Sequence, residues 1–205
     1  MSDSAKLVLS TGKQVDINYD ENAQNPRDLD YTDCNLTKMV CFHRRYNLGD
    51  EHNFDKNDVL SWEELEKLIQ KEEDVCVIDP LYLYDHSGIT ISTSPFSCRW
   101  DSGQVGFVYI TKEAMRKAYN VKRISKKLKQ QAWENLAQEV KTYDQYLTGE
   151  VFWYEVLDAE DNNIDSCSGF YGTNFLANGM GCHISESLTD DEFKEFEKWV
   201  KEGCN

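Results

Sequence analysis

The sequence predicts an α+β fold in which about four helices pack on a largely antiparallel sheet. The strand-like segments follow one another in runs joined by short turns, and they do not alternate regularly with helices as in a parallel sheet. Four other segments combine a helix-start signal with apolar residues spaced three or four apart. The 205 residues include 40% hydrophobic and 12% aromatic side chains, which is enough apolar material for a packed core.

The N-terminal part of the chain is predicted to be a hairpin followed by a loop. Residues 6–10 and 14–20 flank a Thr-Gly-Lys turn, and the second segment alternates apolar and polar side chains like a half-buried strand. Residues 21–37 are polar and rich in turn formers. We therefore predict an N-terminal hairpin and polar loop extension over 1–37 and a single α+β domain over 38–205.

One helix and four strands are predicted in the middle of the chain. Ser61 can cap the helix, Glu64 completes a capping box three residues later, and Leu60 can pack on Leu65. This helix is expected to end near residue 72. Apolar or alternating runs predict the strands, which cover residues 38–46, 74–84, 88–94 and 104–110.

Three further helices and a second hairpin are predicted in the C-terminal half. Thr111 is expected to cap a short helix, and a longer helix over 125–147 has one continuous apolar stripe. The last helix begins after Thr189, where Glu192 completes a second capping box. The hairpin is expected over residues 150–158 and 163–172.

The composition disfavours several functional classes. The chain has 37 acidic and 22 basic residues and a net charge of −15, which repels polyanions and argues against direct nucleic-acid binding. No apolar run is long enough to span a membrane, and the N-terminus lacks the pattern of a signal peptide. The seven cysteines are odd in number and scattered, which is typical of reduced thiols, so a cytoplasmic location is expected.

The charge is unevenly distributed along the chain. Residues 112–129 contain eight basic residues and one acidic residue, so the remainder carries −22. This basic segment is interpreted either as a solvated face that pairs with the protein's own acidic surface, or as a contact surface for an acidic partner. Spaced carboxylates elsewhere can imitate the phosphates of a duplex and occupy a basic nucleic-acid channel. The alternative is that the protein is merely acidic.

The loops between residues 84 and 103 contain the best candidates for catalysis. Two tripeptides, at 85–87 and 101–103, look like fragments of a hydrolase site, in which a nucleophile needs a base and an orienting group. Asp followed by Gly also sets tight turns, which is the alternative interpretation. If the protein is an enzyme, these residues should meet Tyr84 in one pocket. The expected catalytic residues are then His86, Asp101 and Ser102.

If the protein acts by binding, two segments are expected to make the contacts. The first consists of the loops at 84–88 and 99–103, where the indole of Trp100 is expected to be exposed. The second is the acidic turn of the C-terminal hairpin. The predicted binding residues are Tyr84, Asp85, His86, Arg99, Trp100, Asp101, Asp158, Glu160 and Asp161.

No metal ion or cofactor is expected. The chain has no Cys-x-x-Cys pair, and the acidic turn lacks the Gly and Glu of an EF-hand loop at the sixth and twelfth positions. No phosphate loop or dinucleotide fingerprint precedes a helix. The remaining candidate ligand of a divalent ion is His52, which lies after Asp50 and before Asp55 and Asp58 in the sequence.

Four stretches carry a resemblance to a known family. They read LYLYDHSGITISTSPFSCRWDSGQVGFVYI, RISKK, TYDQYLTGEVFWYEV and DSCSGFYG, and lie between residues 81 and 172. Together with their surroundings, from residue 38 onward, they resemble an acidic protein family of phages and mobile elements of Gram-positive bacteria. Small acidic proteins of such elements often belong to the antirestriction or anti-CRISPR class. The resemblance implies no catalytic residue.

The charge and the resemblance together predict a protein that binds another protein. The expected function is inhibition of a host nucleic-acid-handling defence enzyme, a restriction or CRISPR nuclease, through an acidic surface that can imitate DNA. The expected partner is basic, and neither nucleic acid nor membrane is expected to bind directly. One alternative is a small hydrolase or nucleotide-processing enzyme with its site at residues 84–103. Another is a structural protein that self-associates, for example as a homodimer.

Overall fold

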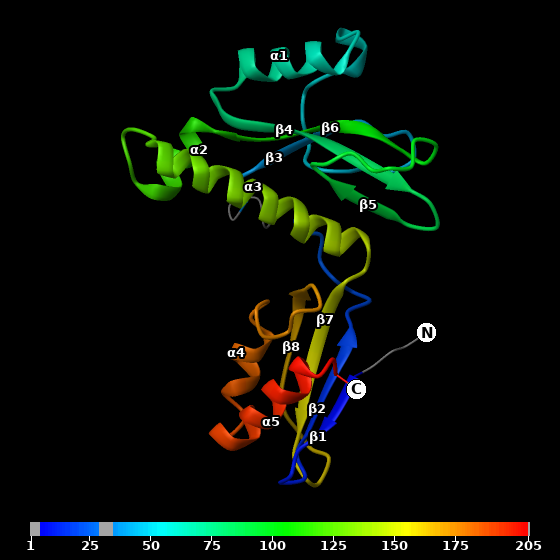
Figure 1. Ribbon diagram of the computed structural model, residues 1–205, viewed down its shortest axis with the longest axis vertical. Coiled ribbons are helices and arrows are strands. Elements are labelled where there is room, and N and C mark those ends of the chain that lie inside the picture. Colours follow the sequence, from blue (N-terminus) through cyan, green and yellow to red (C-terminus); the bar gives the residue numbers. More distant parts are fainter. Residues whose placement is uncertain (1–4, 29–34, 205) are drawn as a thin grey trace. The chain divides into compact units, whose positions relative to one another are not determined.

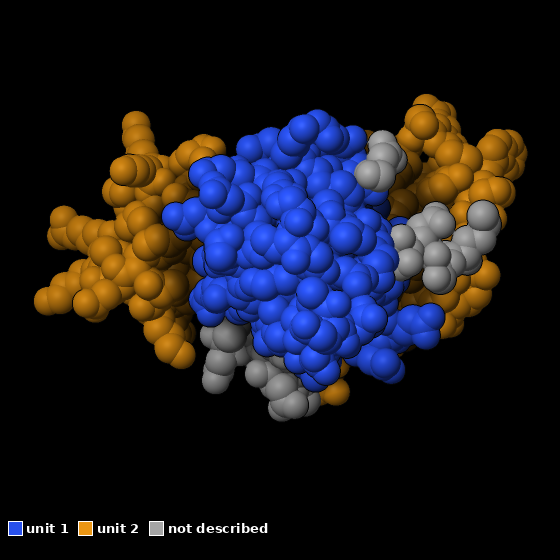
Figure 2. All heavy atoms as spheres, turned by 90° about the horizontal axis from the view of Figure 1, so that it is seen from below, with its two compact units in different colours: residues 1–24, 149–205 blue, residues 25–148 orange. Residues whose placement is uncertain are grey.

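The chain forms two compact units. The computed structural model describes residues 5–28 and 35–204. Unit 1 combines Met1–Gln24 with Gly149–Asn205, and unit 2 is the intervening segment Asn25–Thr148 (Figures 1 and 2). This division differs from the boundary at residue 37 that the sequence suggested, because the N-terminal hairpin pairs with a strand near the C-terminus.

Unit 1 contains an antiparallel four-stranded sheet in the order β1-β2-β7-β8. The two predicted hairpins form it, with β2 paired to β7 so that Val15 lies opposite Val156 and Ile17 opposite Tyr154. Both members of each pair are buried. The hairpin therefore supplies half of this sheet and is not an extension. The strands are β1 Ala5–Val8, β2 Gln14–Tyr19, β7 Val151–Leu157 and β8 Asn163–Tyr171.

Two helices cover one face of the sheet in unit 1 (Figure 1). The predicted helix α5 (Asp190–Lys201) buries Phe196 and Trp199 against the sheet. A six-residue helix, α4 (Met180–Ser185), was not predicted, because the glycines around it indicated a loop. It buries Met180 and Ile184, which are four residues apart and lie on one side of a helix.

The capping box of α5 also fastens the β1–β2 turn. Thr189 and Glu192 exchange the expected bonds, with the Thr189 N–H donating to the carboxylate at 2.8 Å. The same carboxylate accepts bonds from the Thr11 hydroxyl at 2.5 Å and the Lys13 ammonium at 3.1 Å. Burial raises the pKa of Glu192, but these bonds outweigh it and lower the pKa to about 2. The helix cap is therefore also a tertiary contact.

Unit 2 contains a second antiparallel sheet, in the order β3-β6-β4-β5. The central strand β6 approaches β3 so closely that a Cβ on Gly106 would lie 1.8 Å from the carbonyl oxygen of Val40. Only glycine fits at this position. The strands are β3 Lys38–Cys41, β4 Val75–Asp85, β5 Ile89–Ser92 and β6 Ser102–Thr111.

Helices cover both faces of this second sheet (Figure 1). Helix α3 (Lys126–Leu147) buries its predicted stripe against one face, and α2 (Lys112–Tyr119) adds Met115 to the same core. Helix α1 (Trp62–Glu72) packs Leu65 and Ile69 on the other face, after the short 3-10 helix η2 (Lys56–Asp58). Ser61, Thr111 and Ser125 cap α1, α2 and α3.

Two local predictions in unit 2 were wrong. The strand expected over 38–46 ends at Cys41, because the His43 ring nitrogen accepts the N–H groups of Arg45 and Tyr46 and turns the chain. Leu60 does not pack on Leu65. Its backbone N–H donates to Glu64 at 2.8 Å, and its side chain is 94% exposed.

The α+β class and the antiparallel pairing predicted from the sequence are confirmed, with two sheets and five α-helices in the described residues. Within residues 5–28 and 35–204, no helix has the length and apolarity needed to cross a membrane.

Replacing Glu192 with Gln is expected to destabilise unit 1 by about 1–3 kcal/mol at neutral pH, because the Thr11 and Lys13 donors lose a charged acceptor. The pKa of about 2 in the folded protein lies below the ordinary glutamate value of 4.5. The stabilisation is therefore complete above pH 4.5 and lost as the pH falls through about 2. Thermal unfolding of both proteins across this range measures the difference.

The matched control is Glu160→Gln, which removes the same charge from an exposed turn. A difference between Glu192→Gln and the parent protein that stays constant down to about pH 2 would contradict the assignment of the pKa.

Candidate functional site

The predicted loop residues 84–88 and 99–103 lie together where β4 and β6 meet in unit 2. Tyr84 pairs with Ser102 in the sheet, and the Asp85 N–H donates to the Asp101 carbonyl at 2.8 Å. The His86 Nδ1 lies 3.3 Å from Asp101 Oδ2. Six predicted site residues, Tyr84, Asp85, His86, Arg99, Trp100 and Asp101, thus belong to one structural feature, which we call the β4–β6 tip.

The tip does not assemble a hydrolytic triad. The Ser102 hydroxyl donates to the carbonyl of Cys98, within its own turn. Asp101 could orient His86, but the side chains are 39% and 62% exposed, and a catalytic pair is normally oriented within a water-shielded site. The residues with positive φ in the first turn are Ser87 at φ 59° and Gly88 at φ 153°, and in the second turn the Asp101 carboxylate accepts a bond from the Cys98 thiol at 3.6 Å. The turn interpretation therefore accounts for this geometry.

A segment after β3, which the sequence analysis did not include, completes the tip. Arg45 forms an ion pair with Asp85, and the Tyr46 hydroxyl donates to the same carboxylate at 3.4 Å. The guanidinium carbon of Arg45 lies 5.5 Å from the centre of the Tyr46 ring, and His43 stacks on that ring at 5.0 Å. No local signal in the sequence links residues 43–46 to residue 85.

Aromatic side chains are concentrated at the tip. The Tyr84 ring centre lies 6.1 Å from that of His86 and 5.8 Å from that of Phe96. Trp100 is 96% exposed, as the sequence predicted. Trp, Tyr and Arg are the residues most enriched at the energetic centres of protein–protein interfaces. The composition of the tip is therefore that of a protein-contact surface.

The acidic turn at residues 158–161 lies in unit 1, between β7 and β8. Asp158 accepts N–H bonds from Glu160 and Asn162, each at 2.9 Å. Bonds from the Asn162 side chain and from these backbone groups lower its pKa. Asp161 accepts a bond from Gln14 at 2.8 Å and adopts φ 63°. Asp158 therefore builds the turn, whereas Glu160 and Asp161 are exposed.

The acidic turn is the end of a longer ribbon without basic residues, the acidic hairpin (residues 149–172, net charge −6). It belongs to a unit with 17 acidic and five basic residues, whereas unit 2 has 20 acidic and 17 basic residues. Most of the excess negative charge is therefore in unit 1. The six carboxylates of the acidic hairpin are those of Glu150, Glu155, Asp158, Glu160, Asp161 and Asp165.

All five lysines of unit 1 form ion pairs with carboxylates of the same unit. The pairs are Lys6–Asp16, Lys13–Glu192, Lys194–Asp191, Lys198–Glu202 and Lys201–Glu197. Eleven other carboxylates in the described part of unit 1, including all six of the acidic hairpin, form no ion pair with described residues. Unit 1 therefore presents uncompensated negative charge.

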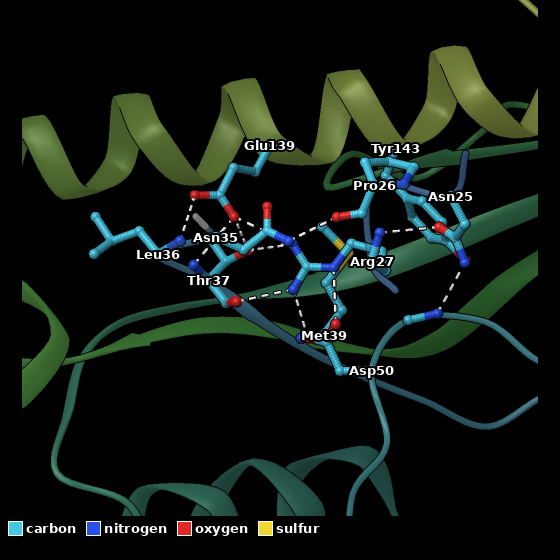
Figure 3. Close-up of polar contacts among 11 residues, drawn as sticks. Asn25, Pro26, Arg27, Asn35, Leu36, Thr37, Met39, Asp50, Glu139 and Tyr143 are labelled. Carbon is cyan, nitrogen blue, oxygen red and sulfur yellow. Dashed lines mark hydrogen bonds and ion pairs between the residues drawn. The ribbon is translucent and has the colours of Figure 1, made fainter. Parts of the chain in front are cut away.

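A buried arginine in unit 2 was missed by the sequence analysis. Arg27 binds both oxygens of Asp50, at 2.9 and 2.5 Å, and Glu139 at 3.2 Å (Figure 3). It also donates to the hydroxyl and carbonyl oxygens of Thr37, at 3.2 and 2.9 Å. The adjacent hollow of about 650 Å³ also borders on Asn25 and Gly49. Because Arg27 already has protein acceptors, its role is structural.

The cysteine and histidine residues near this network do not form a metal centre. Burial raises the pKa of the Cys41 thiol to about 12, so it stays protonated and is a poor nucleophile. The His52 Nε2 lies 3.2 Å from the Cys41 carbonyl. In the described part of the chain, no three His, Cys, Asp or Glu residues are grouped so that they could hold a metal ion.

Comparison with known proteins finds no match to this chain among family models, curated proteins or solved structures.

Replacing Arg27 with Met is expected to destabilise unit 2 by about 3–5 kcal/mol, because Asp50 and Glu139 would remain partly buried without their counter-charge. Urea unfolding followed by circular dichroism measures the change. Glu134→Gln, an exposed change on the same helix as Glu139, should leave stability within about 0.5 kcal/mol. Equal stability of the Arg27→Met and parent proteins would contradict the structural role.

Replacing Trp100 with Phe is expected to remove the tryptophan fluorescence component that acrylamide quenches most readily, because the other four indoles are buried or half-buried. The free energy of unfolding should change by less than about 0.5 kcal/mol, since the Trp100 side chain is almost fully exposed. Trp199→Phe, in the core of unit 1, is the contrasting variant. Unchanged quenching in Trp100→Phe would show that this side chain is covered in solution.

Proposed function

We propose that this protein is an inhibitor encoded by a phage or mobile element, which binds a basic surface of a nucleic-acid-handling defence enzyme in the cytoplasm of its bacterial host. The observation that carries this proposal is the uncompensated acidic surface of unit 1. Its lysines are all paired, and eleven of its described carboxylates form no ion pair with described residues.

The acidic hairpin is the element best suited to enter a basic nucleic-acid channel. Glu150, Glu160 and Asp161 are exposed, and the bonds made by Asp158 hold the turn in one conformation. A rigid surface loses little conformational entropy on binding. Complementary charge raises the association rate and favours basic partners over others. Such a hairpin would compete with the nucleic acid for the same channel.

The β4–β6 tip supplies a second kind of contact in this proposal. Complementary charge mainly raises the association rate and the selectivity for a partner. Most of the affinity at protein interfaces comes from a few packed aromatic and arginine side chains. Trp100, Tyr84 and Arg45 provide such side chains. The enzyme alternative has less support, because Ser102 donates its hydroxyl hydrogen to Cys98 and His86 is exposed.

The proposal predicts a salt-sensitive complex that inhibits a nuclease. Immobilised protein should capture a nucleic-acid-handling enzyme from a bacterial lysate at about 50 mM salt and release it at about 500 mM, because the Debye length shortens from about 14 to about 4 Å. The captured enzyme should cleave its substrate more slowly when the protein is added. Capture that resists high salt, or an enzyme that retains full activity, would contradict the proposal.

Charge-neutral variants locate the contact. Neutralising Glu150, Glu160 and Asp161 with the corresponding amides should weaken binding at least tenfold at low salt, because three exposed charges are lost from one ribbon. The control neutralises Asp58, Glu72 and Glu134, three exposed residues of unit 2. Equal weakening by both triple variants would show that only net charge matters and that the acidic hairpin is not the contact.

A further inference from the structure

Unit 2 carries a concentrated positive surface that the proposed function does not use. Helix α2, the following turn and the start of α3 form the basic hairpin (residues 112–129, net charge +7). Among pairs between described residues, Lys112 and Arg116 are the basic residues of this hairpin that form one, both with Asp74, at 2.6 and 3.5 Å. The basic residues that are exposed and form no ion pair with described residues are Lys117, Lys122, Arg123, Lys126, Lys127 and Lys129.

The expectation that this segment pairs with the protein's own acidic surface is met at Asp74 alone, within the described residues of unit 2. The sequence also places Lys126, Lys127 and Lys129 near the N-terminus of a 22-residue helix, with no acidic residue in its first turn. The positive end of the helix dipole disfavours a lysine charge there. Neutralisation by an acidic surface would remove this repulsion.

The acidic hairpin of unit 1 has the complementary charge. It carries −6 and no basic residue, against +7 for the basic hairpin. A nucleic acid is the other polyanion that lysines bind, but the negative charge of unit 1 repels it, whereas the same charge attracts the basic hairpin of another copy. The charges on the two hairpins therefore favour a protein occupant over a nucleic acid.

We propose that the basic hairpin of one copy docks on the acidic hairpin of a second copy. The two surfaces differ, so a single contact would leave one basic and one acidic hairpin free. A two-fold dimer makes the contact twice and uses all four hairpins, whereas a head-to-tail chain stays open. Both surfaces belong to this chain, so the dimer stands independently of the proposed function. It would cover the acidic hairpin and compete with a basic partner.

Sedimentation velocity tests the dimer. At about 20 mM salt the mass should rise with concentration from the 23.8 kDa of one chain toward twice that value, and it should return to that of one chain at about 500 mM salt. A contact between the two units of a single chain would leave the mass independent of concentration. A monomer at about 200 μM and low salt would overturn the proposal.

Charge reversal identifies the two surfaces. One variant replaces Lys122, Lys126 and Lys127 with Glu, and the other replaces Glu150, Glu160 and Asp161 with Lys. Each alone should be monomeric, because the changes reduce the basic hairpin of the first variant from +7 to +1 and the acidic hairpin of the second from −6 to zero. An equimolar mixture should form a heterodimer, because the unaltered acidic hairpin of the first variant (−6) can dock on the unaltered basic hairpin of the second (+7). The mixture also guards against misfolding, since only folded variants should restore association.

Two further measurements decide between the alternatives. The control reverses Lys67, Lys71 and Lys141, which are exposed on α1 and α3 outside the basic hairpin. The dissociation constant of its dimer should lie within about twofold of that of the parent protein, because screening weakens the effect of charges that lie outside the contact. If the control lost dimerisation to the same extent as the Lys122, Lys126 and Lys127 variant, the basic hairpin would not be the contact surface. A parent protein that stays monomeric but binds a short DNA duplex, through lysines whose reversal abolishes binding, would identify nucleic acid as the occupant and overturn the proposal.

Discussion

The guanidinium group of Arg27 holds together the parts of unit 2 that the backbone hydrogen bonds of the sheet do not connect. It lies between Asp50 and Glu139, and these two carboxylates also accept backbone N–H bonds from Met39, Leu36 and Thr37. The start of β3, the loop after it and α3 are thereby fixed to one another (Figure 3). A buried arginine is stable only when such acceptors surround it, so the position of each partner depends on the others.

Helix α3 is the element to which this network connects the sheet. Further along it, Asp144 accepts bonds from the Thr90 hydroxyl at 2.5 Å and the Ile91 N–H at 2.7 Å. The two carboxylates of one helix thus hold the loop before β3 and the edge strand β5, while its apolar stripe packs on the sheet between them. This rigid support leaves the exposed lysines at the start of the helix and the exposed side chains of the tip free to contact other molecules.

Charge segregation is the second organising feature, and it explains how one chain can bear both an acidic and a basic contact surface. The lysines of unit 1 form ion pairs with carboxylates of the same unit, and the unit keeps a large excess of acidic residues. Eight of the 17 basic residues of unit 2 lie in the basic hairpin. Because screening limits exposed charges to a range of about 8 Å at physiological salt, a contact at each surface depends mainly on the local charge there, and the charge of the rest of the chain acts over a longer range at low salt.

The sequence by itself determined what depends on neighbouring residues: most of the strands and their turns, the caps at Ser61, Thr111 and Thr189, and the clustering of charge. It also indicated the exposure of Trp100. Only the tertiary structure decided the pairing of β2 with β7, the partners of Arg27 and the place of Arg45 beside Asp85. Periodicity and capping report on residues within a few positions, whereas these contacts join residues far apart in the chain and depend on how complete elements pack.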